Sequence, residues 1–413
     1  MDLTLEDREL IAPVTALEFD KSGKLFAGEG PYLKIYATAR RRLVTSERVF
    51  DSQRIHSIKL YDSNYGTRAI ISGGRIVSVL NIQNNESSSK IHAVSSVSFN
   101  DWIWDVCLLE GTTEQECECV SVVTGHNAVW IWNFNENTKW KVSQCEEQCI
   151  LYCARFIGRT LDNMWLACGT VFNEVLLWKV MDKQPGCDEG LVKKRLIGHY
   201  GVIFSVRYCQ ERQLLCSVSD DRSIKVWKVV FTDSYSDVTV PSELTLTLYG
   251  HKARVWDCLV LKDHIVSIGE DSMCLLWNFD GEITRSWKGH IGKSVWCLAC
   301  SSDERMVATG GGDSAIRLWL VEDEIENTRD EEHLFSSIPS EQQSSQQMVE
   351  EIPRMIGLLH DTSVFVMTDK GLDIKVCELR PQYAEPYWLN RGQVASDECS
   401  ASSLEKVALY TSS

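Results

Sequence analysis

The sequence predicts an all-β fold made of repeated units. Three segments align closely, and each opens on Gly-His and ends on Trp: residues 198–227, 250–277 and 289–319. Their spacing of about 40 to 50 residues is typical of propeller blades. Within each segment, short runs of alternating apolar and polar residues are separated by turns, as in half-buried strands. These observations predict a WD-repeat β-propeller with four strands in each blade.

Each strong repeat carries four polar or aromatic residues at constant spacing, with Asp six residues and Ser or Thr ten residues before the Trp. The sets are His199, Ser217, Asp221 and Trp227; His251, Ser267, Asp271 and Trp277; and His290, Thr309, Asp313 and Trp319. We interpret each set as a buried structural tetrad whose members satisfy one another's hydrogen bonds. Each also resembles a Ser-His-Asp catalytic triad, but a copy in every strong blade favours a structural role, so we predict no enzyme.

Four weaker copies precede these repeats and bring the predicted number of blades to seven. They are residues 13–37 and 53–82, with Tyr36 and Leu80 in place of Trp; residues 99–134, with Trp132 but His126 at the acidic position; and residues 148–180, with Trp178 but Phe172 at that position. We expect residues 3–11 to supply the outer strand of the last blade, because ring closure removes exposed strand edges.

The pattern changes beyond the ring. We predict a seven-bladed propeller over residues 1–320, an acidic Ser/Gln-rich linker over 321–351, a blade-like unit of an incomplete second propeller over 352–380, and a polar, disordered tail over 381–413. Residues 321–351 hold ten acidic residues against Arg329, and so carry −9 of the formal net charge of −16.

Composition excludes several classes of protein. A net charge of −16 disfavours a nucleic-acid surface extending over the whole molecule. The sixteen cysteines form no regular framework and no apolar signal segment begins the chain, so we expect reduced thiols and a cytoplasmic protein. No stretch approaches the roughly eighteen uncharged apolar residues of a membrane span.

Three further patterns have both a functional and a structural interpretation. Five innermost strands carry an aromatic residue that could stack bases or bind a partner, although we favour packing between blades. Several cysteines have zinc-ligand spacing, but we expect them to be small apolar strand residues and predict no metal. Three glycines resemble a phosphate loop, but no helix follows, so we predict a turn and no cofactor. The aromatic residues are Trp104, Tyr152, Phe204, Trp256 and Trp296. The cysteines are Cys145, Cys149, Cys153, Cys297 and Cys300, and the glycines are Gly310, Gly311 and Gly312.

Loop residues near the Gly-His turns are candidates for partner binding, because propellers bind ligands at the rim. They are Tyr200, Lys252, Arg254 and Lys293. A separate basic run could contact RNA phosphates, although a solvated loop is the interpretation that we favour. It comprises Arg40, Arg41 and Arg42, with Arg48 nearby.

Several phrases are more particular than the general repeat. They are NDWIWDVCLLEG from residue 100, GHNAVWIW from 125, GHYGVIFSV from 198, GHKARVWD from 250 and GEDSMCLLWNFDGEI from 269. With ELIAPVTALEF and LFAGEGPYLKIY near the beginning, this sequence resembles the WD repeat-containing protein six family over residues 9–320. That family comprises the WD-repeat regulatory subunits of the tRNA position-34 ribose 2′-O-methyltransferase.

The resemblance implies a non-catalytic scaffold that binds a separate FtsJ-type methyltransferase, which carries the S-adenosylmethionine site, and helps it recognise the anticodon loop of tRNA. It also implies a growth-control kinase as a secondary partner. Members of the family are much longer, with further propellers, so we expect a short isoform, an incomplete gene model or a fragment. The alternatives are a generic WD-repeat adaptor in growth-control signalling or ubiquitin transfer, and an enzyme that uses one tetrad.

Overall fold

The computed structural model describes residues 12–63, 66–84, 89–110, 118–183, 189–231, 242–290 and 292–321, together with three strands between residues 354 and 376. The chain divides into two units, Met1–Ser340 and Glu341–Ser413. Strands joined by turns make up almost all of the described residues, and no α-helix occurs among them. No helix in these ranges is long and apolar enough to cross a bilayer.

Among the described residues, the first unit contains seven groups of consecutive antiparallel strands, which we number as blades 1 to 7; blades 3 and 4 belong to one eight-stranded sheet. Blade 1 comprises β1 (Val14–Phe19), β2 (Lys24–Glu29), β3 (Tyr32–Ala37) and β4 (Arg42–Arg48). Blade 2 comprises β5 (Ser57–Ser63), β6 (Gly66–Gly73), β7 (Ile76–Asn84) and β8 (Ser89–Ser98). Blade 3 comprises β9 (Ile103–Leu108), β10 (Cys119–Thr124), β11 (Ala128–Asn133) and β12 (Thr138–Cys145).

The strong repeats follow the fourth blade. Blade 4 comprises β13 (Leu151–Ile157), β14 (Trp165–Thr170), β15 (Glu174–Lys183) and β16 (Glu189–Ile197). Blade 5 comprises β17 (Ile203–Cys209), β18 (Leu214–Ser219), β19 (Ser223–Val229) and β20 (Ser242–Tyr249). Blade 6 comprises β21 (Val255–Val260), β22 (Ile265–Gly269), β23 (Met273–Trp277) and β24 (Ile283–Lys288), and blade 7 comprises β25 (Val295–Cys300), β26 (Met306–Gly311) and β27 (Ile316–Leu320).

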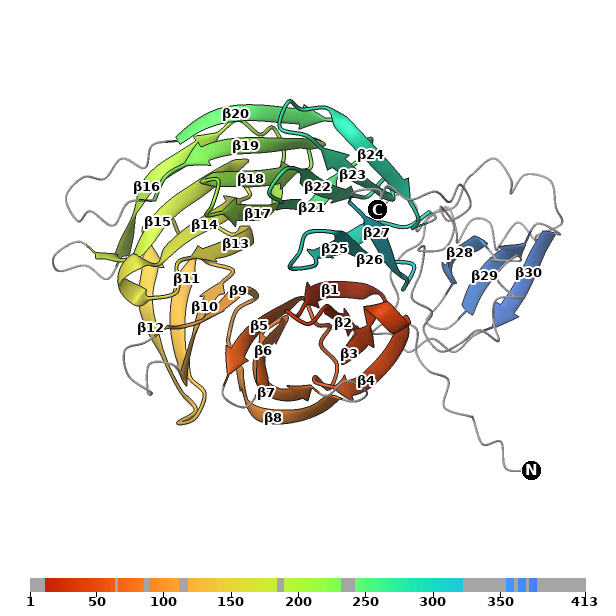
Figure 1. Cartoon of the computed structure of the whole chain (residues 1–413), viewed down its shortest axis with the longest axis horizontal. Helices are drawn as coiled ribbons and strands as arrows, with labels where there is room; N and C mark the ends of the chain where they lie inside the picture. Colours follow the sequence, from red (N-terminus) through yellow and green to blue (C-terminus); the bar gives the residue numbers. More distant parts are fainter. Residues whose placement is uncertain are drawn as a thin grey trace. The chain divides into compact units, whose positions relative to one another are not determined.

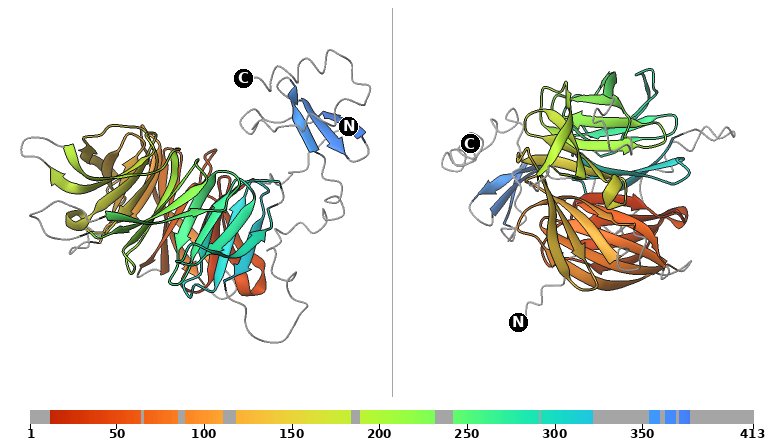
Figure 2. Two further views of the ribbon diagram at one scale, coloured as in Figure 1. Left: turned by 90° about the horizontal axis from the view of Figure 1, so that it is seen from above. Right: turned by 90° about the vertical axis from the view of Figure 1, so that its left-hand side faces the viewer.

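The core is divided among the interfaces between blades. One cluster of buried apolar side chains lies between each pair of neighbouring blades, and the cluster of blades 7 and 1 closes the ring. At that closure the Cys297 thiol donates to the carbonyl of Val14 over 3.5 Å. The first strand of each blade faces a common centre (Figure 1), and two further views show the twist of the blades (Figure 2). The prediction of an all-β WD-repeat propeller is confirmed.

Two details differ among the blades. Blades 3 and 4 are joined by a short parallel pairing of β12 with β16, at Gln144↔Glu189 and Cys145↔Gly190, which the sequence did not predict. Blade 7 has three described strands. Its predicted outer strand, residues 3–11, lies outside the described residues.

Consecutive antiparallel strands place the loops at two opposite edges of the ring. One edge holds the turns between second and third strands and the loops that lead into the next blade. We call it the Gly-His edge, because its loops 198–202, 250–254 and 289–294 carry the Gly-His pairs. The other edge holds the remaining turns.

The second unit contains one three-stranded antiparallel sheet of β28 (Arg354–Leu359), β29 (Ser363–Thr368) and β30 (Gly371–Val376). These strands lie within the segment predicted to be blade-like. The predicted linker after residue 321 and the predicted tail after residue 380 lie outside the described residues.

Candidate functional site

The four residues of each tetrad form one continuous chain of hydrogen bonds. In blade 6, His251 Nδ1 lies 3.0 Å from Asp271 Oδ2 and His251 Nε2 lies 2.8 Å from Ser267 Oγ. The indole N–H of Trp277 donates to the same Oγ over 2.8 Å. The same bonds span 2.8 to 2.9 Å in blades 5 and 7, through His199, Asp221, Ser217 and Trp227 and through His290, Asp313, Thr309 and Trp319.

Local sequence explains how blade 6 assembles its tetrad. His251 lies in the loop before β21, Ser267 lies in β22, Asp271 lies in the next turn and Trp277 ends β23. The preceding residue must be small, because a Cβ at Gly250 would lie 2.6 Å from the Trp277 ring. The Gly-His pair therefore combines a glycine that packing against the tryptophan requires with a histidine that the hydrogen bonds require.

The surroundings of each tetrad favour the ionised form of its aspartate. Burial alone would raise the pKa of Asp271, but the hydrogen bond and charge of His251 and the backbone amides of Lys252 and Met273 together outweigh it, so the pKa lies below its usual value. The pKa values of Asp221 and Asp313 are lowered in the same way by His199 and His290. Each carboxylate therefore stays ionised, and its hydrogen bond orients the imidazole ring.

The position of the hydroxyl groups explains what the tetrads do. Ser217, Ser267 and Thr309 are fully buried. Each hydroxyl already accepts a bond from an indole N–H and lies against an imidazole nitrogen, so it has no free approach for a substrate. The geometry anchors the tryptophan of each blade by satisfying its buried donor.

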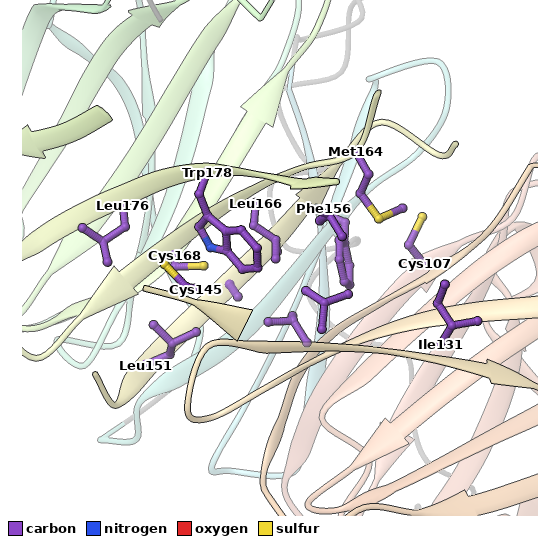
Figure 3. Close-up of a cluster of buried hydrophobic side chains, with 14 of the residues drawn as sticks. Cys107, Ile131, Cys145, Leu151, Phe156, Met164, Leu166, Cys168, Leu176 and Trp178 are labelled. Atoms are coloured by element: carbon purple, nitrogen blue, oxygen red, sulfur yellow. The ribbon is translucent and has the colours of Figure 1, made fainter. Parts of the chain in front are cut away.

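Blade 4 anchors its tryptophan with a residue that sequence reasoning missed. The indole N–H of Trp178 donates to Asn127 Oδ1 over 3.1 Å, and the Cys168 thiol donates to the same oxygen over 3.4 Å. Asn127 belongs to a turn of blade 3 and is fully buried, with a left-handed φ of 61°. Figure 3 shows the Trp178 ring beside Cys168 and Cys145. Asparagine adopts this φ readily, which is the only local signal in the sequence.

Blades 1 and 3 use two further substitutes. In blade 3, the indole N–H of Trp132 donates to Asn137 Oδ1 over 3.1 Å. In blade 1, the hydroxyl of Tyr36 donates to Glu29 over 2.6 Å, and Lys34 pairs with the same carboxylate. Blade 2 has the apolar Leu80 at this position, which needs no acceptor.

The structure brings most of the predicted rim residues to one edge. Tyr200, Lys252, Arg254 and Lys293 all lie in loops of the Gly-His edge, and Tyr200 is 89% exposed. The Arg254 Nε lies 2.6 Å from Asp220 Oδ1. By contrast, Arg40 and Arg41 lie between β3 and β4 and Arg42 begins β4, all at the opposite edge, and so do not join this group.

The five aromatic residues of the innermost strands lie near the centre of the ring. Trp104, Phe204, Trp256 and Trp296 are partly buried, whereas Tyr152 is exposed. The ring centroids of Tyr152 and Phe204 are 6.2 Å apart, and those of Phe204 and Trp256 are 4.6 Å apart. These aromatics therefore contact one another across blades 4 to 6 while leaving part of their surface accessible.

The inner strands also carry buried charges that sequence reasoning missed. Lys59 Nζ lies 3.1 Å from Asp105 Oδ1, and Arg155 is 3.7 Å from the same atom. Arg207 pairs with Asp257, whose Oδ1 also accepts from Ser205 over 2.6 Å. Each pair joins neighbouring blades across about fifty residues of sequence, so no local pattern announces it.

The candidate cysteines and glycines serve the packing of the blades. Burial raises the pKa of Cys145, Cys153 and Cys300 to about 12, and it also raises the pKa of Cys297 well above its ordinary value. In the described ranges, no group of three or more ligand side chains could hold a metal ion. Among the glycines, a Cβ at Gly310 would lie 2.4 Å from Val14 Cγ1, so this position serves the close packing of blade 7 on blade 1.

Comparison with known proteins identifies the relatives. Residues 190–228 and 281–319 match the family model "WD domain, G-beta repeat". The chain is 32% identical over 323 residues to the tRNA (34-2'-O)-methyltransferase regulator WDR6 of Rattus norvegicus, covering 75% of this chain and 28% of that protein. For WDR6 of Mus musculus and Homo sapiens the identities are 32% and 29% over 327 residues, with the same coverage. The chain thus spans little more than a quarter of the length of these curated relatives. It is a WD-repeat β-propeller protein related to the tRNA (34-2'-O)-methyltransferase regulators named WDR6.

Proposed function

We propose that this chain is a non-catalytic scaffold that binds an FtsJ-type methyltransferase in the cytoplasm and supports 2′-O-ribose methylation of the tRNA wobble nucleotide. The observation that carries the proposal is the 32% identity with a tRNA (34-2'-O)-methyltransferase regulator over 75% of this chain. The aligned length is that of a whole propeller, so the similarity extends well beyond a single repeat.

The geometry of the polar residues supports a scaffold. The hydroxyl, imidazole and carboxylate groups of the three tetrads bond to one another around buried tryptophans, and their hydroxyls are fully buried. The predicted rim residues Lys252 and Arg254 are exposed at the Gly-His edge of the ring, where a partner can reach them. We propose this Gly-His edge as the contact with the enzyme.

Reconstitution tests the proposal. The full chain is mixed with the FtsJ-type methyltransferase of the same organism, complex formation is followed by gel filtration, and methylation at position 34 is measured by mass spectrometry of digested tRNA. We expect a complex and faster methylation than with the enzyme alone. The absence of both would contradict the proposal.

A pair of charge variants locates the contact. Lys252→Ala with Arg254→Ala changes the Gly-His edge, whereas Arg41→Ala with Arg42→Ala removes the same charge from the opposite edge. We expect the first variant to weaken the complex and the second to leave it unchanged. The reverse result would move the contact to the opposite edge.

A further inference from the structure

The most exposed large apolar side chains gather on one part of the propeller. Among the described residues, five such side chains are more than half exposed: Tyr200 at 89%, Ile197 at 72%, Tyr249 at 68%, Phe172 at 64% and Ile150 at 55%. All five lie at the Gly-His edge of blades 4 and 5. We call these five residues the apolar edge patch.

Strand pairing brings the members of the patch close together. Ile150 precedes Leu151, which pairs with Thr170, two residues before Phe172. Ile197 pairs with Glu174, two residues after Phe172. In the next blade, the amide of Tyr200 donates to Asp221 over 2.9 Å, and Tyr249 pairs with Ser223 in the strand that follows Asp221. The patch therefore occupies the same edge of two neighbouring blades.

The turn position of Phe172 does not require an apolar residue. Phe172 occupies the turn position of Asp221, Asp271 and Asp313 in the tetrad blades. Blade 4 has no tetrad, because Asn127 accepts the hydrogen bond of Trp178, so no aspartate is needed at that position to orient a histidine. A solvated polar residue would fit there, yet an exposed phenylalanine is present. Large exposed apolar patches usually mark interaction sites.

The charges around the patch favour one kind of partner. Apart from the tetrad aspartates Asp221 and Asp271, the edge segments 146–150, 171–174, 195–202, 220–222, 249–254 and 270–272 carry five carboxylates and four basic side chains. Arg195 lies between Glu147 and Glu174, at 2.5 and 2.8 Å. Arg254 lies between Asp220 and Glu270, at 2.6 and 3.9 Å. A phosphate backbone would meet net negative charge here, whereas lysine or arginine would be attracted.

Aromatic side chains continue the surface toward the centre of the ring. Tyr152 contacts Phe204, which contacts Trp256. Accessible aromatic faces attract lysine and arginine by cation–π interaction and also pack well against apolar side chains. This row therefore favours the same partner chemistry as the carboxylates.

We propose that the apolar edge patch and the aromatic row beside it dock a segment of another protein that presents aromatic or aliphatic side chains flanked by lysine or arginine. Apolar anchors would cover Phe172, Ile197 and Tyr200, and the basic flanks would face the carboxylates of the rim. The inference stands independently of the proposed methyltransferase function, since it concerns only the chemistry of this surface.

The probe is a peptide selected from random twelve-residue peptides displayed on phage and panned against the full chain. The selected peptide is labelled with fluorescein, and its Kd is measured by fluorescence anisotropy. We expect selection of peptides with at least two large apolar residues and a net positive charge. We expect Phe172→Ser with Ile197→Ser to raise the Kd by at least about tenfold, because buried anchors carry most of the binding energy.

Matched variants separate the patch from exposed apolar residues elsewhere. Trp140→Ser with Ile283→Ser removes side chains that are 46% and 44% exposed outside the Gly-His edge and should leave the Kd unchanged. Tyr200→Ser provides a second test within the patch. Unchanged thermal unfolding of each variant verifies folding. Equal binding by all variants, or selection of acidic peptides, would overturn the proposal.

A labelled single-stranded oligouridine distinguishes nucleic acid from protein. We expect that the double variant Phe172→Ser with Ile197→Ser does not weaken any binding of the oligouridine to the chain. If the oligouridine binds the full chain and this variant loses that binding, the patch is a nucleic-acid surface and the proposal is wrong.

Discussion

Blades 5 to 7 and blades 1 to 4 solve one packing problem in different ways. The first group anchors each central tryptophan with the same His, Ser or Thr, and Asp tetrad. In the second group, Trp178 uses Asn127, Trp132 uses Asn137, and Tyr36 uses Glu29. Apart from blade 2, which has Leu80 at this position, the blades share a satisfied donor at a buried aromatic residue, whatever group satisfies it.

The comparison also shows a difference in range. A tetrad combines a loop, two strands and a turn that lie within about thirty residues of sequence, whereas Asn127 reaches Trp178 from the neighbouring blade, fifty-one residues away. Blades 3 and 4 are further joined by the β12–β16 pairing. Substituting the anchor has therefore coupled these two blades.

The largest expected effect comes from removing the anchored ring itself. Trp277→Ala and Trp178→Ala should each lower the free energy of unfolding by about 3 to 5 kcal/mol, because each leaves a large cavity in the core. Both rings are almost fully buried. Urea unfolding followed by circular dichroism measures the loss. A much smaller loss of unfolding free energy for Trp178→Ala than for Trp277→Ala would show that the two tryptophans are not equivalent anchors.

Replacing the tetrad histidine should have the next largest effect. His251→Ala leaves Ser267 and the ionised Asp271 without their partner in the interior, so we expect a loss of about 2 to 3 kcal/mol. His126→Ala is the control, because its pair with Asp101 is exposed and worth less than about 1 kcal/mol. Equal losses in the two variants would show that the tetrad adds nothing beyond a surface pair.

Removing the substitute acceptor should cost less. Asn127→Gly retains the left-handed backbone but leaves the Trp178 indole N–H unpaired, so we expect a loss of about 1 to 2 kcal/mol. Asn173→Gly is a matched control, with a φ of 65° in a surface turn of blade 4. Urea unfolding of the two variants measures the difference. Indistinguishable variants would rule out Asn127 as an anchor.

The smallest expected effect is a difference in acid sensitivity. The pKa of Asp271 is lowered in the folded protein from its ordinary value of 3.8. The unfolded chain therefore binds a proton first, and the stabilisation present at neutral pH is lost as the pH falls through 3.8 and below. Asp271→Asn should show a shallower fall of the urea midpoint between pH 6 and pH 3 than the unmodified chain. A parallel fall would contradict a contribution from this carboxylate.

Much of the fold could be predicted, and the reason is the regular spacing of its repeats. Strand alternation and the positions of Trp227, Trp277 and Trp319 predicted the blades, and constant spacing predicted the members of the tetrads. The β12–β16 pairing could not be predicted, because a parallel contact between two outer strands leaves no periodic signal. The interpretation of the aromatic row was incomplete, since these residues both touch one another and remain partly accessible.

The sequence alone determined which strands form and which residues recur at each blade, because those features depend on alternation and spacing over a few dozen residues. Tertiary structure decided that Asn127 accepts the hydrogen bond of Trp178, that Lys59 pairs with Asp105, and which apolar side chains gather at one edge. These contacts join neighbouring blades, and their partners lie some fifty residues apart in the chain. Only the packing of neighbouring blades brings them within reach of one another, so the candidate binding surface is a property of the assembled propeller.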